Sequence, residues 1–478
     1  MDPRPPVDTR PAVDTRPPSG GALADYFKFA ERGTNFATEV KAGVTTFMVM
    51  AYILFLNPNI LSNMFIPDTA AMEASKAPIA AATALVAGVM SIAMGLIANV
   101  PIALAAGLGI NALVAFFLVL TLGLTPAGAM GVIVIEGLVV LVLVLVGLRE
   151  AIMNAVPVSL KRAIAVGIGL FILFIGFVDG GLISKTGGTA AENPVPVQFV
   201  FPTTPALLTF ILGLIITIAL VVRRVPAALL LSILITTVLA IVLGVQPMPS
   251  SFIATPNFST LGAFDLTNVF THLGVLAAIL VIFSFMLTDF FDTMGTATAI
   301  AEQADLVDDR TGRIPNTGRI LAVDAVAAAA GGAAGISSNT SYIESAAGVA
   351  EGGRTGLTAV VVGLLFLAAI LLTPLATLVP FQATAPVLVV VGYLMVTLIR
   401  DIDFADLEEG FPALLALILM PLTFSITVGI GAGFVAYVLV KVMRGKFGDI
   451  HPLMWLVAIA FLVYFAQNWL NLLINPPA

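Results

Sequence analysis

The sequence has 478 residues, of which 59% are hydrophobic and only 10% are charged. A soluble domain carries about 25% charged residues, so this composition excludes a soluble globular protein and indicates a polytopic membrane protein. The net charge of −7 leaves no basic surface for nucleic acid, which is therefore excluded as a partner.

Cysteine and histidine usage excludes further classes of protein. The chain has no Cys and only two His, His272 and His451. Disulfides, thiolate metal sites and a Cys nucleophile are excluded, and two histidines do not suffice for a histidine metal cage. We therefore expect no metal, no cofactor and no enzyme activity. The expected partners are the lipid bilayer and a transported solute.

The N-terminal region precedes the first apolar segment. Residues 1–20 contain the Pro-rich near-repeat RPPVDTRPAVDTRPP, so we expect a disordered cytoplasmic tail over 1–24. At about 20 residues per crossing, the apolar content allows roughly fourteen spans. We predict these spans at 42–57, 79–98, 102–120, 126–147, 151–177, 205–222, 226–244, 271–295, 318–331, 341–351, 356–374, 384–399, 411–426 and 427–444.

Positive charges in the connections predict the topology, because Lys and Arg are retained on the cytoplasmic side. With the N-terminus in the cytoplasm, only Lys76 and Lys185 of the 21 basic residues fall outside. We therefore expect a multi-pass protein of the cell (inner) membrane. A further apolar stretch, 453–474, contains Trp and Tyr and is expected to form an extra helix, which either spans the membrane or lies along its surface.

Two sequence echoes suggest related halves. PALLTFIL at 205–212 resembles PALLALIL at 412–419, and AAGLGIN at 105–111 resembles AAGISSN at 333–339. Seven spans per repeat is an odd number, so the second copy would enter the membrane in the opposite direction. This arrangement is the inverted repeat of secondary transporters.

Glycine-rich runs precede two of the predicted spans. PIALAAGLGINA lies at the start of 102–120, and AAAAGGAAGISSNTS precedes 341–351. Such runs disfavour a continuous helix and allow close approach to the backbone, so they mark a candidate substrate site near the bilayer midplane. The alternative is that Gly and Ala merely let helices pack tightly.

Ionisable residues within apolar spans are costly and need an explanation. Asp289 and Asp292 stand three residues apart, which on a helix places both carboxylates on one face. Close carboxylates in a low dielectric do not both ionise easily, which makes this group a proton-coupling candidate together with Glu344. Asp324 could instead brace a helix. Glu136 has no visible partner, and a structural role is favoured.

The substrate class follows from the same residues. No Lys or Arg lies deep within the predicted spans, so a simple anion would meet carboxylates without a counter-charge. A neutral, flat, hydrogen-bonding molecule fits better, because a carboxylate can accept two N–H groups from one edge. Phe290, Phe291 and Tyr342 could stack on such a ring, although a single Phe in this chain is more often lipid-facing.

At these residues the chain resembles a known family. It is similar to the nucleobase/cation symporters of the xanthine/uracil permease family, and among them to the AzgA-like adenine, guanine and hypoxanthine permeases. The resemblance covers nearly everything after about residue 25. It is carried by the stretches at 27–58, 107–112, 136–172, 289–296 (DFFDTMGT) and 342–360 (YIESAAGVAEGGRTGLTAV).

The resemblance implies an architecture. It implies an all-α fold of fourteen spans in two inverted seven-span repeats, with short strand breaks before spans 3 and 10, and a possible homodimer through the gate domain. The core domain would hold spans 1–4 and 8–11, and the gate domain spans 5–7 and 12–14. In this chain the core would cover 25–150 and 265–375, the gate 151–250 and 384–446.

The resemblance also implies site residues. Asn111, Asp289, Asp292 and Glu344 become the expected substrate and proton residues. Some family members carry a His on span 8, and this chain has none there, so proton transfer should fall to carboxylates. The full set expected to bind substrate is Asn111, Asp289, Phe290, Ser338, Asn339, Thr340, Ser341 and Glu344. The set expected to couple protons is Asp289, Asp292, Asp324 and Glu344.

The leading hypothesis is a secondary transporter that imports purine nucleobases by proton symport. A sodium ion could replace the proton, and the sequence does not decide which base is preferred. The runner-up is an anion exchanger or passive channel on the same fold, against which the acidic site argues. A sensor or scaffold without transport is a third possibility.

Overall fold

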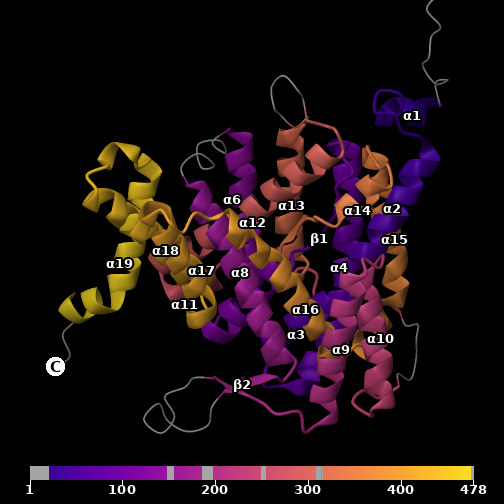
Figure 1. Cartoon of the computed structure of the whole chain (residues 1–478), viewed down its shortest axis with the longest axis horizontal. Helices are drawn as coiled ribbons and strands as arrows, with labels where there is room; N and C mark the ends of the chain where they lie inside the picture. The colour runs from indigo at the N-terminus through magenta and orange to yellow at the C-terminus, as the bar shows by residue number, and fades with distance from the viewer. Residues whose placement is uncertain are drawn as a thin grey trace, which may run out of the picture.

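A computed structural model of the protein describes residues 21–147, 156–185, 197–248, 255–307, 314 and 316–474. The protein is helical, and its apolar helices pack side by side around a small interior strand pair (Figure 1). The first half holds α1 (Gly21–Phe27), α2 (Phe36–Met50), α3 (Ile53–Ser62), η1 (Asn63–Phe65), α4 (Thr69–Ile97), β1 (Leu104–Ala106), α5 (Leu108–Ala112), η2 (Leu113–Thr121), α6 (Pro126–Leu145), α8 (Val158–Asp179), β2 (Ile183–Lys185), β3 (Val197–Phe199), α9 (Pro205–Val222) and α10 (Ala228–Val242).

The second half is also built of helices that are interrupted by a short strand. It holds α11 (Asn268–Leu273), α12 (Val275–Gln303), α13 (Thr317–Ala333), β4 (Asn339–Ser341), α14 (Ser345–Ala350), α15 (Gly356–Ala369), η3 (Ile370–Leu378), α16 (Phe381–Val396), η4 (Thr397–Asp401), α17 (Leu407–Thr423), α18 (Ile426–Met443), η5 (Phe447–Asp449) and α19 (Pro452–Ile474).

Eight helices among the described residues are long and apolar enough to cross a membrane. Shorter apolar helices include Leu108–Thr121, Ala228–Val242, Gly356–Leu372 and Pro452–Ala466. The chain is therefore a polytopic membrane protein with at least eight apolar spans. The predicted extra segment 453–474 is helical, as α19, and packs on α18 through an edge contact of Phe434 with Phe461, whose ring centroids are 6.3 Å apart.

The ends of several helices follow from the local sequence. Thr125 and Thr204 cap α6 and α9, each accepting a backbone N–H through its side chain, at 2.9 Å and 3.2 Å. Each is followed by Pro at the first helical position. Proline has no backbone N–H, so no donor is left unpaired there. Asp68 caps α4 in the same way. These caps fix where the apolar runs become helical.

The N-terminal boundary differs from the prediction of a tail over 1–24. Residues 1–20 lie outside the described residues, whereas Gly21–Phe27 form α1. This helix is held by packing: Phe27 and Phe29 form a small apolar cluster with Leu357 of α15, and the hydroxyl of Tyr26 donates to Leu96 O of α4 at 2.5 Å.

The two interior strands come from distant parts of the chain. β1 pairs antiparallel with β4, in the register Leu104 with Ser341 and Ala106 with Asn339. The ladder continues beyond the strands, since Gly107 N donates to Ser338 O and Tyr342 N to Ala103 O, both at 2.9 Å. This pairing satisfies backbone groups that the apolar surroundings could not. The strand breaks expected from the resemblance are confirmed.

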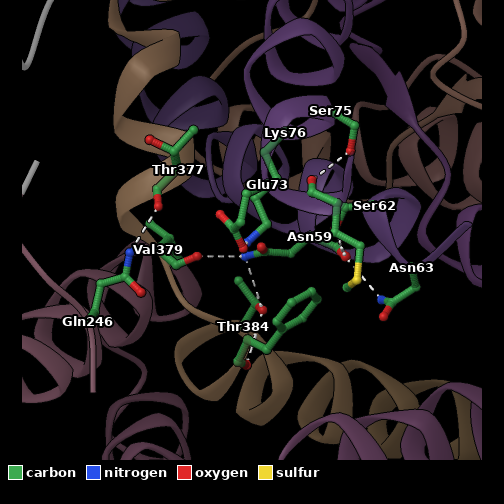
Figure 2. A network of polar contacts seen from close by, with 12 residues as sticks. Asn59, Ser62, Asn63, Glu73, Ser75, Lys76, Gln246, Thr377, Val379 and Thr384 are labelled. Carbon is green, nitrogen blue, oxygen red and sulfur yellow. Dashed lines mark hydrogen bonds and ion pairs between the residues drawn. The ribbon is translucent and has the colours of Figure 1, made fainter. Parts of the chain in front are cut away.

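A polar contact joins α3 and α4 to the chain just before and inside α16 (Figure 2). The side-chain amide of Asn59 donates to Val379 O at 3.0 Å, and its Nδ2 also lies 3.5 Å from Thr384 Oγ1. The Lys76 ammonium lies 4.7 Å from the ring centroid of Phe381. This contact joins elements that the sequence predicts to belong to the core and the gate.

Candidate functional site

The strand pair places two short helices beside the long helix α12. β1 runs into α5, and β4 leads through a short turn into α14. The turn between α13 and β4 uses Gly335 and Ser337, both with positive φ, of 76° and 71°. Gly335 suits this left-handed conformation, and Ser337 adopts it at a steric cost. The result is a compact region where polar residues from both halves of the chain meet.

Asp289 lies in the middle of α12 and faces β4. Its side chain is buried, and the hydroxyl of Ser338 donates to Asp289 Oδ2 at 3.1 Å. Asp292, one turn further along α12, is exposed. The three-residue spacing thus places the two carboxylates on one helix, in different environments. Phe290 is buried and contacts Phe291 edge-on, with ring centroids 5.7 Å apart.

Asp324 of α13 holds β4 and α12 in place. Its Oδ1 accepts hydrogen bonds from the backbone N–H and the hydroxyl of Ser341, at 2.9 and 2.8 Å. Its Oδ2 accepts from the Thr293 hydroxyl at 2.6 Å. Thr293 Oγ1 also lies 2.8 Å from the hydroxyl of Thr340. Three donors directed at one carboxylate stabilise its ionised form and fix the strand against two helices.

Glu344 lies directly before α14 and is partly buried. The hydroxyl of Tyr52, which is fully buried where α2 meets α3, donates to Glu344 Oε1 at 2.5 Å. The hydroxyl of Tyr342 donates to Ala106 O at 2.7 Å. No sequence pattern predicts Tyr52 at the site, because its partner lies 292 residues away. Glu344 keeps its second oxygen for another donor.

Two buried amides have no hydrogen-bond partner among the described residues. The Oδ1 and Nδ2 atoms of Asn111 and of Asn339 are without a hydrogen bond, although both side chains are fully buried. Buried polar groups are almost always paired, so such groups need an explanation. A polar ligand that supplies both a donor and an acceptor would satisfy them.

Glu136 lies near the middle of α6, which packs against α12 and α13. Neither of its carboxyl oxygens has a hydrogen-bond partner among the described residues. It is fully buried. An acidic residue in the apolar run VIVIEGLVV was a visible signal, and a buried carboxyl without a partner needs an explanation.

The second sequence echo, AAGLGIN with AAGISSN, does not match residues that lie at equivalent positions of the structure. Ala105 lies in β1, whereas Ala333, which the echo matches to it, is the last residue of α13. Asn111 lies in α5 and its match Asn339 lies in β4. Both matches fail for the same reason: the Ala- and Gly-rich composition repeats short strings without regard to structure.

Fold and site together describe a multi-pass helical membrane protein with an interior strand break. The fold is similar to that of the transmembrane domain of a cyanobacterium bicarbonate transporter BicA, at 14% identity and a TM-score of 0.58, covering 83% of this chain and 97% of that one. It is also similar to SLC26A9, at 12% identity and a TM-score of 0.57, covering 86% and 66%. These likenesses establish the fold alone.

Sequence comparison identifies the family. Residues 37–432 match the model of the xanthine/uracil permeases, described as a permease family, and the chain belongs to this family. It is 39% identical over 448 residues to the guanine/hypoxanthine permease PbuG of Bacillus subtilis (strain 168), covering 93% of this chain and 99% of that protein. It is 40% identical over 444 residues to the adenine permease AdeP of Escherichia coli (strain K12), covering 93% and 96%. The protein is therefore a membrane permease and not an enzyme.

Proposed function

We propose that this permease imports purine nucleobases by proton symport. Relatives at 39% and 40% identity are named as permeases for guanine and hypoxanthine or for adenine, and they match this chain over nearly its whole length. A purine is flat and uncharged and presents N–H donors and ring nitrogen acceptors along its edges. The site residues described above offer complementary groups.

The unpaired side chain of Asn111 is the observation that carries this proposal. Its buried donor and acceptor atoms have no partner in the part of the chain that the structure describes, and α5 packs against α12, which bears Asp289. A base placed here would bond with the Asn111 amide and give N–H groups to Asp289 and Glu344. Asn339 and the chain around Ser338 and Thr340 complete the edge, and Phe290 contributes an apolar wall.

The proposed transport cycle uses the two-domain architecture. Fourteen spans in two inverted repeats would form a core around the strand pair and a gate that includes α8, α16, α17 and α18. Alternating access follows when the core moves against the gate and exposes the site first outside and then in the cytoplasm. In this proposal the N-terminus is cytoplasmic and the gate domains mediate a homodimer.

The transported proton would bind to the cluster of acidic residues at the site. Asp289, Asp292 and Glu344 are the proposed coupling residues. Asp324 belongs to the same acidic group, and its three donors give it a bracing role with Ser341. A proton lowers the free-energy cost of burying negative charge and so prepares the site for a neutral base.

The Glu344→Gln variant tests this function. The amide keeps the size of the side chain and a contact with Tyr52, so the variant should fold, which size-exclusion chromatography can verify. We expect it to lose concentrative uptake of the purine in proteoliposomes. Normal concentrative uptake by this variant would contradict the assigned role. An anion exchanger would instead carry bicarbonate or chloride and ignore purines.

A further inference from the structure

Lys161, near the start of α8, holds a positive charge against the helix that bears Asp289 and Asp292. Its Nζ lies 5.3 Å from the centroid of the Phe291 ring, and α8 packs against α12 (Figure 1). An ammonium group is attracted to the face of an aromatic ring. Because α8 belongs to the proposed gate and α12 to the proposed core, this contact crosses the boundary between the two domains.

Asp292 directly follows Phe291 and lies on an open face of α12. Asp292, Gly295 and Ala299 are exposed, and a Cβ atom added at Gly295 would meet no heavy atom within 4 Å. An ionisable residue within a span faces protein or a water-filled cavity, because lipid does not solvate its charge. Water can therefore reach Asp292 along this face, which gives a proton on Asp292 a way out.

The residues around Asp292 carry an excess of negative charge. Asp289 lies on the same helix, and the elements packed against α12 include α6 with Glu136, α13 with Asp324, and α14, which Glu344 directly precedes. The elements β4, α5 and α19 also pack against α12 and contain no charged residue. An ionised Asp292 thus lies among other acids, and a positive partner would stabilise it.

The other basic residues on helices packed against α12 are directed elsewhere in the described chain. They are Arg162 of α8, which donates to Asp401 O at 2.5 Å, Arg319 of α13, which donates to Ile97 O at 3.4 Å, Lys441 of α18, which donates to Glu408 at 2.6 Å, and His272 of α11, whose Nε2 lies 3.1 Å from Leu122 O. Lys161 differs from these residues because its ammonium lies against α12 itself.

We propose that Lys161 drives the release of the transported proton from Asp292 on the cytoplasmic side. In the loaded state Asp292 is a carboxylic acid, and Lys161 stays over Phe291. Consecutive Cα atoms are about 3.8 Å apart and the lysine side chain is long and flexible, so the ammonium can move from the ring to the neighbouring carboxyl. Asp292 then gives its proton to water, and the carboxylate that results pairs with Lys161. This inference rests on the proposed function and adds a gate residue to the carboxylates that bind the proton.

The contact between gate and core gives the proton a direction. A positive charge beside a carboxyl group favours its ionised form, so Asp292 loses its proton where the core brings it to Lys161. When the core moves against the gate, Asp292 leaves Lys161 and can take up the next proton from outside. The position of the core thus decides whether Asp292 holds a proton.

The Lys161→Gln variant tests the proposal in proteoliposomes. Exchange of labelled for unlabelled base needs no proton release, because the carrier can stay protonated while one base leaves and another binds. Net uptake under an inward proton gradient needs proton release in every cycle. We expect the variant to exchange adenine, guanine or hypoxanthine, while its net uptake falls roughly tenfold or more. If this variant does not fold, Lys161→Met removes the same charge and keeps an apolar contact with Phe291.

Arg162→Gln is the matched control. It removes the neighbouring positive charge, which is directed to Asp401 O, and should keep the wild-type ratio of net uptake to exchange. Lys161→Arg keeps the charge at the site and should restore most of the net uptake. A loss of net uptake in Arg162→Gln as large as that in Lys161→Gln would contradict a specific role of Lys161.

Asp292→Asn shows whether Lys161 acts through Asp292. The amide has no proton to release, so this variant should let the base equilibrate without accumulation, and adding Lys161→Gln should change nothing further. A further several-fold loss of flux in the double variant would overturn the assignment. Net uptake by Lys161→Gln equal to that of the wild type would overturn it as well.

Failure of the proposed function gives a different result. Wild-type protein that neither exchanges nor accumulates any of the three bases contradicts purine transport itself, and exchange without gradient-driven net uptake contradicts proton symport. These outcomes concern the wild type alone, whereas the role of Lys161 is decided by the ratio of net uptake to exchange among the variants.

Discussion

The hydroxyl of Tyr52 donates to Glu344 Oε1 at 2.5 Å, joining the junction of α2 and α3 to the residue directly before α14. This bond fixes one carboxylate oxygen and leaves the other for a ligand. It connects two chain segments that sequence comparison alone would treat separately.

Tyr52→Phe should weaken base binding while preserving the fold. Phe fills the same buried volume and removes only the hydroxyl. A hydrogen bond to a charged group contributes about 1.5–3 kcal/mol, so we expect the dissociation constant for the preferred purine to rise roughly tenfold or more. Isothermal titration measures this change. An unchanged dissociation constant would mean that base binding does not depend on the hydrogen bond from Tyr52 to Glu344.

Asp324→Ala should destabilise the protein. The substitution removes the acceptor for the Ser341 N–H, the Ser341 hydroxyl and the Thr293 hydroxyl, all buried. Each stranded group costs about 1–3 kcal/mol, so the apparent melting temperature in detergent should drop clearly. Thr293→Val removes one donor and should have a smaller effect. Equal melting temperatures for wild type and Asp324→Ala would refute the bracing role.

Glu39→Ala should destabilise the start of α15. Glu39 is fully buried and accepts from Arg354 N at 2.8 Å and from the Thr358 hydroxyl at 2.6 Å. Its loss leaves these donors unpaired, and we expect the free energy of unfolding to fall by about 2 kcal/mol. Lys41→Ala breaks the exposed ion pair with Glu351 and should cost less than about 1 kcal/mol. Similar losses in both variants would disprove the role of Glu39 as a buried acceptor at the start of α15.

Asn59→Ala should loosen the polar contact of Figure 2. The lost bond to Val379 O contributes about 1 kcal/mol. A change of this size shifts the equilibrium between the intact and the broken contact roughly fivefold. The chain has no Cys, so a single Ser62→Cys substitution reports on this region. With Asn59→Ala added, a water-soluble maleimide should label it several times faster. Identical labelling rates would indicate that the contact does not open.

Sequence patterns predicted the simple helices well. Helix α9 spans 205–222 as predicted, because Thr204 and Pro205 mark its start and the apolar run marks its length. The first apolar stretch was predicted too short, at 42–57 instead of Phe36–Phe65. Glu39 interrupts the apolar pattern at one end and Asn59 at the other, and both are buried by partners far along the chain.

The candidate site was predicted in its parts but not in its contacts. Asn111, Asp289 and Glu344 were recognisable as polar residues beside glycine breaks or within apolar spans. Tyr52, which donates to Glu344, and Ser338, which donates to Asp289, come from other segments of the chain, and neither spacing nor periodicity reports on such distant contacts. Tertiary packing decides which polar groups reach these carboxyls, so this part of the site required the structure.

The central claim is tested most directly by uptake of radiolabelled bases into proteoliposomes that contain the wild-type protein. Adenine, guanine, hypoxanthine, xanthine and uracil are each supplied with an inward proton gradient and again after the gradient is collapsed. The account predicts accumulation of one or more of the three purines adenine, guanine and hypoxanthine only while the gradient persists. Equilibration without accumulation, or entry of none of the five bases, would contradict it.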